Sequence, residues 1–155
     1  MKSLPNLILL LFIYPSMTFS APLEIGDNLL PLSLPDQYGN LHNLSDAHTI
    51  LFAPDKETGE LAHEQLQHEN KTDMMAKGFW FISDISRMPG FVTRFFALPA
   101  MRKYPYFVLL GYKEAQTAWL PSKEGALTLM QIRSGKVIAI EYIDTQEGVS
   151  QRLHN

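Results

Sequence analysis

The order of the apolar segments constrains the fold of this chain more than any other feature. Three short apolar runs have the length and composition of buried strands, and they span residues 49–53, 79–82 and 106–110. Two longer runs, 127–133 and 136–143, flank Ser134-Gly135, which is a strong signal for a two-residue β-hairpin. Because helical patterns separate the short runs, the sequence predicts a layered α/β domain that ends in an antiparallel hairpin.

Two helical patterns lie between the short runs. The first helix should end before Lys77-Gly78, and it carries its apolar face at Leu61, Ala62 and Leu66. The second helix should begin near Pro89, and its helix-spaced apolar residues are Phe91, Val92, Phe95 and Phe96. We expect both helices to cover the sheet.

The N-terminal segment, residues 1–20, has the pattern of a secretory signal peptide. Lys2 supplies a positive start, residues 7–13 form an unbroken apolar run, and Ser20 belongs to a small-residue cleavage site. The apolar run is shorter than the roughly 20 residues that a membrane-spanning helix needs. We therefore expect a cleaved signal peptide, a single domain over residues 21–155, no transmembrane anchor after cleavage, and a periplasmic or secreted protein.

The composition excludes two classes of function. The net charge of −3 argues against nucleic-acid binding, which requires a basic surface. The chain contains no cysteine, so packing alone must hold the fold. Neither a thiol peroxidase nor a disulfide oxidoreductase can work without a thiolate, so we lean against an enzyme and expect no cofactor.

Residues 50–64 form a strand, a turn and the start of a helix around a spaced motif. The motif is Pro54-x-x-x-Thr58-x-x-Leu61-x-x-Glu64. Thr58 suits the opening turn of a helix, where capping explains a hydroxyl side chain. The acids that we expect near this turn and the end of the next strand are Asp55, Glu57 and Asp84.

Together these motifs resemble the AhpC/TSA branch, the peroxiredoxins, of the thioredoxin-like superfamily. The opening pattern is similar as well: Ile25-Gly26-Asp27, Pro31, and Leu34-Pro35-Asp36-x-x-Gly39 within a predicted hairpin. Small periplasmic YtfJ-type proteins are similar in size and export. The resemblance implies a thioredoxin-like layered fold with an N-terminal β-hairpin, a central mixed sheet and a C-terminal antiparallel hairpin. The last helix should be short, because only residues 144–155 follow the hairpin.

The departures from that family concern its reactive residues. Leu61 stands where peroxiredoxins carry the reactive cysteine, and Leu127 stands where they carry an arginine that steadies the anion. The resemblance therefore implies a vestigial active-site frame of Pro54, Thr58, Leu61, Glu64 and Leu127. A binding or interaction module without redox catalysis is the function that we expect.

Two other functions stay open at this stage. One is an enzyme that uses acid–base groups of the former pocket, which are Asp55, Glu57, Glu64 and Asp84. Strongly raised pKa values of these carboxylates in a concave pocket would favour it, and a filled, apolar site would count against it. The other is a structural or envelope-stress protein without a ligand, which a smooth surface would favour.

A metal site is not expected from the histidines. His63 and His68 lie five residues apart, whereas two zinc ligands on one helical face need a spacing of four. We read these residues as a solvated helix face.

Two features point to surfaces for a partner. Residues 85–113 contain five basic residues and no acid, together with several aromatic residues. This stretch is either a partner or lipid-headgroup surface or, as we expect, an amphipathic helix with its aromatic side chains in the core. The short tail, with Val149 and Leu153 as its apolar anchors, should leave one face of the sheet thin for a protein partner or homo-oligomer.

Overall fold

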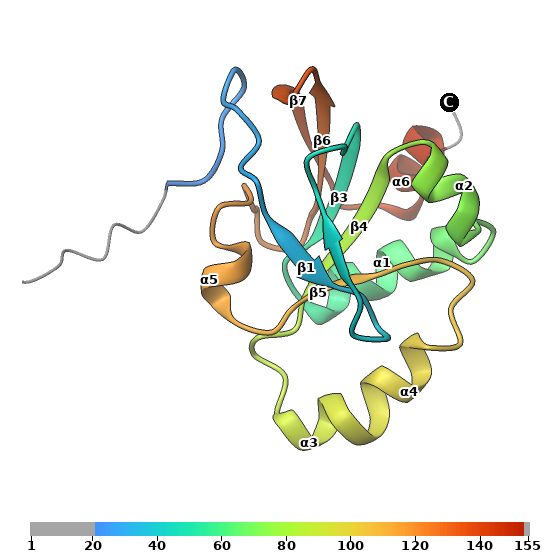
Figure 1. The fold of residues 1–155 in the computed structure, drawn as a ribbon. Helices are drawn as coiled ribbons and strands as arrows, with labels where there is room; N and C mark the ends of the chain where they lie inside the picture. The colour runs from blue at the N-terminus through green and yellow to red at the C-terminus, as the bar shows by residue number, and fades with distance from the viewer. Residues whose placement is uncertain (1–20, 154–155) are drawn as a thin grey trace, which may run out of the picture.

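A five-stranded mixed sheet forms the centre of the computed structural model, which describes residues 21–153 (Figure 1). Its strands are β3 (Thr49–Ala53), β4 (Phe79–Asp84), β5 (Leu109–Gly111), β6 (Leu127–Arg133) and β7 (Lys136–Ile143), in the order β5-β4-β3-β6-β7. β3, β4 and β5 run parallel to one another, β6 is antiparallel to β3, and β7 is antiparallel to β6. The expected layered α/β architecture is present. The predicted signal peptide, residues 1–20, lies outside the described residues.

The C-terminal hairpin has the bounds that the sequence predicts. Ser134 and Gly135 have φ angles of 52° and 73°. Positive φ at both turn residues matches the twist of a two-residue hairpin, and a glycine adopts it without strain. Leu127, the first residue of β6, pairs with Ile143 and is fully buried.

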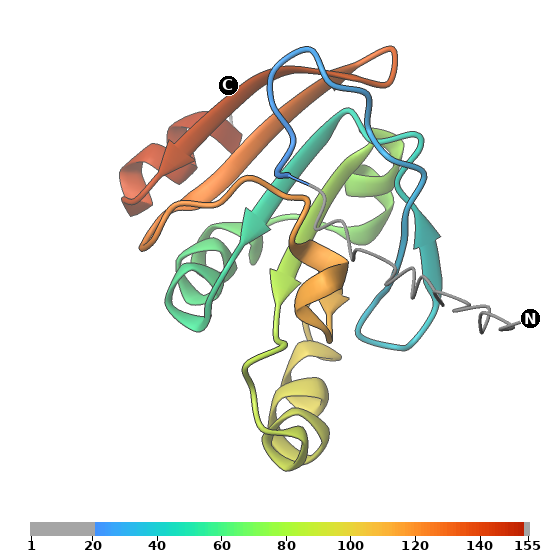
Figure 2. The ribbon, with the colours of Figure 1, turned by 90° about the vertical axis from the view of Figure 1, so that its left-hand side faces the viewer.

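Other elements pack on both faces of the sheet (Figure 2), and each face has its own hydrophobic cluster. Helices α1 (Lys56–Leu66), α2 (Lys71–Ala76) and α6 (Gln146–Leu153) cover one face. The other face packs against the segment before β3, with its strands β1 (Ser33–Pro35) and β2 (Leu41–Asn43), and against residues near α5 (Glu114–Thr117). The strands alternate between the clusters: Leu51 points to the first face, Ile50 and Phe52 to the second.

The turn between β1 and β2 is fixed by Asp36. Its Oδ1 accepts the backbone N–H groups of Tyr38 and Asn40 at 2.8 and 2.9 Å, and its Oδ2 bonds the ring of His42 at 2.8 Å. Gly39 completes the turn with a φ of 91°. Burial of Asp36 raises its pKa, but these hydrogen bonds, led by that of His42, outweigh burial and leave the pKa below its usual value.

Gln37, in the same turn, explains why β5 is shorter than the predicted strand 106–110. Its buried side chain donates to the carbonyl of Tyr106 at 2.8 Å and accepts the N–H of Val108 at 3.1 Å. Because a side chain takes these backbone groups, the strand ladder with β4 begins only at Leu109.

The first predicted helix is two helices in the structure. The side chain of Asn70 caps α2 by accepting the N–H of Asp73 at 2.9 Å, which separates α2 from α1. Gly78 follows with a φ of 60°, and a Cβ there would lie 2.3 Å from Nδ1 of His48. Only glycine fits that position.

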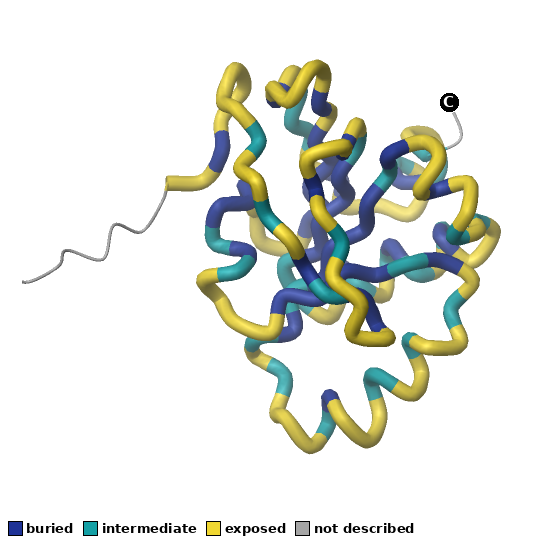
Figure 3. The backbone as a smooth tube through the Cα atoms, viewed as in Figure 1, coloured by how far each residue is buried: buried dark blue, intermediate teal, exposed yellow. Residues whose placement is uncertain are grey.

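The second predicted helix is present, but its aromatic residues are not in the core. It consists of α3 (Gly90–Val92), a π-helical turn η1 (Thr93–Ala97) and α4 (Leu98–Met101). Figure 3 shows the segment mostly exposed, and Phe91, Phe95 and Phe96 expose 64%, 66% and 66% of their surface. The expectation of buried aromatic side chains is wrong, because Val92, Thr93 and Leu98 occupy the inward positions instead.

The tail helix α6 covers its sheet face more fully than the sequence suggests. Val149 is completely buried, and Leu153 packs against the same cluster. The argument for a partner on a thinly covered face therefore loses its basis. Within residues 21–153, no helix is long and apolar enough to cross a membrane.

Candidate functional site

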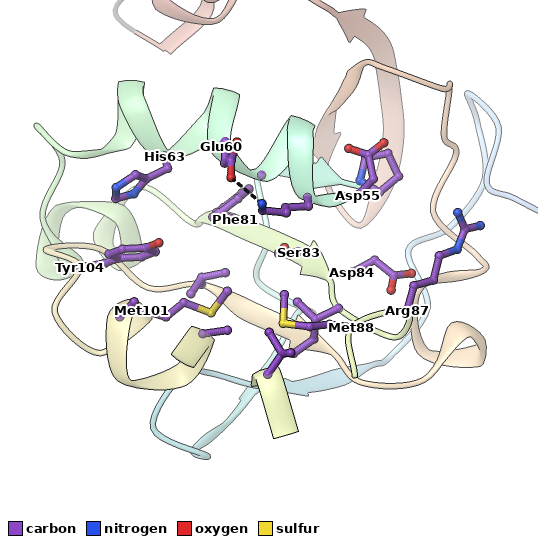
Figure 4. Close-up of a pocket in the computed structure, with 18 of the residues that line it drawn as sticks. Asp55, Glu60, His63, Phe81, Ser83, Asp84, Arg87, Met88, Met101 and Tyr104 are labelled. Carbon is purple, nitrogen blue, oxygen red and sulfur yellow. Dashed lines mark ion pairs between the residues drawn. The ribbon is translucent and has the colours of Figure 1, made fainter. Parts of the chain in front are cut away.

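A pocket of about 550 Å³ opens at the carboxyl ends of β3 and β4 (Figure 4). Helix α1 forms one wall, β4 the floor, and the helical segment 90–101 the facing wall. Most of the lining is apolar, and the apolar residues are Pro54, Phe81, Ile85, Met88, Pro89, Val92, Ala97, Ala100, Met101 and Val108. A concave, mainly apolar cavity of this size is typical of small-molecule sites.

The start of α1 places four residues along the pocket. Asp55 is the N-cap: its Oδ1 accepts the N–H of Thr58 at 2.9 Å, and the Thr58 hydroxyl in return accepts the N–H of Asp55 at 3.3 Å. This capping box begins the helix at Lys56. Lys56, Gly59, Glu60 and His63 then follow at helical spacing on the pocket side.

Most of the predicted frame lies on the core side of α1. Leu61 is in the second turn, where it is partly buried against the cluster that contains the fully buried Leu127. Thr58 is buried, and Glu64 bonds Gln146 of the tail helix. Of the five frame residues, only Pro54 lines the pocket.

Two of the three predicted pocket acids line the pocket. Asp55 and Asp84 line the pocket, whereas Glu57 is exposed outside it. Asp84 accepts the N–H of Ser86 at 2.8 Å and the hydroxyl of Thr117 at 2.5 Å. Both lining acids therefore have structural hydrogen bonds that position loops and helices.

A hydrogen bond between His63 and Tyr106, which the sequence did not predict, joins α1 to the segment before β5. Nδ1 of His63 lies 2.6 Å from the hydroxyl of Tyr106, and its ring lies 4.2 Å from that of Tyr104. Burial, with a smaller contribution from Tyr104, raises the pKa of Tyr106, so its hydroxyl keeps its proton. In the His63 tautomer whose Nδ1 accepts that proton, Nε2 is an N–H donor on a residue that lines the pocket.

The same wall carries a second tyrosine. Burial, and then the negative charge of Glu60, raise the pKa of Tyr104. Tyr104 stacks on Tyr106 with ring centroids 5.0 Å apart. The three rings of His63, Tyr104 and Tyr106 therefore form one aromatic end of the pocket.

Two of the charged side chains that line the pocket pair with each other. Lys56 and Glu60 form an exposed ion pair at 3.4 Å, drawn dashed in Figure 4, and Arg87 lies on the side of Asp84. Such exposed pairs contribute little stability. Among residues 21–153, no group of three or more His, Asp or Glu side chains is placed to hold a metal ion.

Comparison with known proteins finds similar structures but no similar sequences. No family model and no curated protein matches the chain. A protein assigned as the thiol:disulfide interchange protein DsbE of Chlorobium tepidum is 18% identical with a TM-score of 0.56, over 84% of this chain and 96% of that one. The thioredoxin domain of a thiol-disulfide oxidoreductase from Bacteroides vulgatus is 11% identical with a TM-score of 0.51, over 84% and 96%.

A third similar structure belongs to the peroxiredoxin group. Peroxidoxin BcpB from Mycobacterium tuberculosis is 16% identical with a TM-score of 0.50, over 83% of this chain and 92% of that one. The chain has the thioredoxin-like fold. At these identities the comparisons concern the fold alone.

The sequence carries a signal for the side of α1 that lines the pocket. Asp55-x-x-Thr58 is a capping pattern, and it sets Lys56 as the first helical residue. From that start, Gly59, Glu60 and His63 share a face turned away from Leu61. The contact of His63 with Tyr106 joins residues 43 positions apart and has no local signal.

Proposed function

We propose that this protein is a non-redox binding module of the thioredoxin-like superfamily, derived from the peroxiredoxin branch. Its ligand is a molecule or segment with an apolar body and a hydrogen-bond acceptor. The pocket of about 550 Å³ supports this proposal most directly, because its apolar lining lies beside the start of α1 in a chain that has no cysteine.

The chemistry of the lining supports this ligand class. Met88 and Met101 point into the cavity from the facing wall (Figure 4), and methionine side chains adapt to varied apolar shapes. His63 offers an N–H donor at the aromatic end. An acceptor such as a carbonyl or carboxylate, carried on an apolar chain, would satisfy both features.

The structural bonds of Asp55 and Asp84 argue against an acid–base enzyme. A general acid or base must reach a substrate proton, and these carboxylates already cap a helix and bind Thr117. The presence of an open pocket likewise argues against a structural protein without a ligand.

Binding of the apolar dye Nile red tests the proposal. We expect saturable fluorescence enhancement with the wild-type protein. Ala97→Phe should abolish it, because the new ring fills the pocket from the helical wall. Ala115→Phe, at an exposed position of α5 outside the pocket, is the matched control and should bind like the wild type. Equal binding by Ala97→Phe would place the dye elsewhere and contradict the proposal.

Export is a separate part of the proposal. The pattern of residues 1–20 supports secretion or transfer to the periplasm, with cleavage after Ser20. Mass spectrometry of the protein from the periplasmic fraction should find Ala21 as the first residue. An intact Met1 in the membrane fraction would contradict it.

A further inference from the structure

The outer surface of the helical segment 90–101 exposes three large aromatic side chains. Phe91, Phe95 and Phe96 each leave about two thirds of their surface in water. We call these three residues the aromatic face. Large apolar side chains grouped in one segment are a hallmark of an interaction surface, whereas single exposed ones are common.

The inward side of the segment explains why these residues face water. Thr93 is buried, and its hydroxyl donates to the carbonyl of Pro89 at 3.3 Å. Leu98 and Met101 pack against the core, and Val92 and Ala97 line the pocket. The anchoring positions are therefore filled without the phenylalanines, which contribute nothing visible to folding.

The charged residues of the segment that carries the aromatic face all have one sign. No Asp or Glu occurs between residues 85 and 113, whereas Arg94, Arg102 and Lys103 are exposed there. The guanidinium of Arg94 lies 5.7 Å from the ring centroid of Phe95. The whole chain has a net charge of −3, so this basic region stands apart from the rest of the protein.

The shape of the region also matters. In Figure 1 the segment from α3 to α4 projects below the body of the molecule, and the aromatic face lies on this projection rather than in a groove. A protein partner would need a matching cavity for it. A lipid bilayer deforms around a projecting apolar wedge, and its phosphate groups meet the surrounding cations.

We propose that the aromatic face docks on an anionic lipid surface. The three phenylalanine rings enter the boundary between headgroups and acyl chains, and Arg94, Arg102 and Lys103 contact lipid phosphates. The acidic remainder of the molecule stays in water, so the contact is peripheral and reversible. This inference does not depend on the ligand of the pocket.

Vesicle sedimentation tests the proposal. The full protein, freed of residues 1–20, should bind vesicles that mix phosphatidylglycerol with phosphatidylcholine, and bind pure phosphatidylcholine vesicles much more weakly. Added salt should weaken binding. Phe95→Ser with Phe96→Ser should lower the partition coefficient on the order of 100-fold, at about tenfold for each ring. Arg94→Gln should lower it about fivefold.

A matched control lies on β7. Ile138 and Tyr142 expose 38% and 45% of their surface, and changing both to Ser should leave binding unchanged. A tryptophan at position 95 (Phe95→Trp) should shift its emission to the blue only with anionic vesicles. Because the changed side chains are exposed, circular dichroism should show that every variant folds.

Two results would overturn the proposal. The first is vesicle binding that is equal for both lipid compositions or unchanged in Phe95→Ser with Phe96→Ser. The second is the absence of binding to anionic vesicles. If sedimentation equilibrium then shows a dimer that these two substitutions dissociate, the aromatic face is an interface between copies of the chain.

Discussion

The buried amide of Gln37 should be worth several kcal/mol to the fold. It bonds the carbonyl of Tyr106 and the N–H of Val108, and it also reaches the carbonyl of Met101 at 3.3 Å. Gln37→Leu keeps the apolar volume but leaves two buried backbone groups without partners. Each such group costs about 1–3 kcal/mol, so we expect a loss of about 2–6 kcal/mol, a large share of the stability of an ordinary domain.

Urea unfolding measures this loss. The buried indole rings of Trp80 and Trp119 report unfolding by fluorescence. Gln65→Leu is the control, because the exposed amide of Gln65 bonds only Gln146, at 2.9 Å, and its replacement should change stability by less than about 0.5 kcal/mol. A loss below about 1 kcal/mol in Gln37→Leu would refute the view that Gln37 stabilises the backbone at Met101, Tyr106 and Val108, which line the pocket.

Three further predictions concern the pH dependence of stability, the helix α1 and the reactivity of an introduced thiol. Because hydrogen bonds lower the pKa of Asp36 in the folded state, its carboxylate stabilises the fold above the ordinary pKa, and this stabilisation is lost as pH falls through the lowered pKa. Between about pH 6 and pH 3, urea unfolding should therefore show a smaller loss of the free energy of unfolding in Asp36→Asn than in the wild type. An equal loss would contradict this. Gly59→Ala should raise the free energy of unfolding by about 0.5–1 kcal/mol, since its Cβ would meet only the hydroxyl of Ser83, at 3.7 Å; a decrease would mean that the helix wall is tighter than described. Lys56→Cys, exposed at the helix start, should react with iodoacetamide at least about tenfold faster than Leu61→Cys, and the reverse order would restore Leu61 to the former active site.

The sequence predicted the sheet well because its strands carry local signals. The hairpin at Ser134-Gly135 has its predicted bounds, and the strand predicted at 49–53 is β3. The bounds of other elements depend on side-chain hydrogen bonds that these local patterns do not show. The bonds of Gln37 shortened the strand predicted at 106–110, and the cap at Asn70 divided the first helix.

The site was harder to predict because it depends on helix register. Family spacing put Leu61 at the former reactive position, but the helix begins at Lys56, so Leu61 lies in the second turn and faces the core. The prediction that the aromatic side chains of the second helix lie in the core was wrong for a related reason. Helical spacing shows that Phe91 and Phe95 share a face, but it does not show whether that face meets the sheet or water.

Methionine-methyl NMR tests the central claim most directly. Met88 and Met101 line the pocket, whereas Met130 is buried in the cluster on the other face of the sheet. A titration with decanoic acid, which has an apolar chain and an acceptor carboxylate, should shift the methyl signals of Met88 and Met101 in a saturable way and leave that of Met130 in place. If Met88 and Met101 do not move with any apolar acid or alcohol, or if all three signals move together, the pocket is not a binding site.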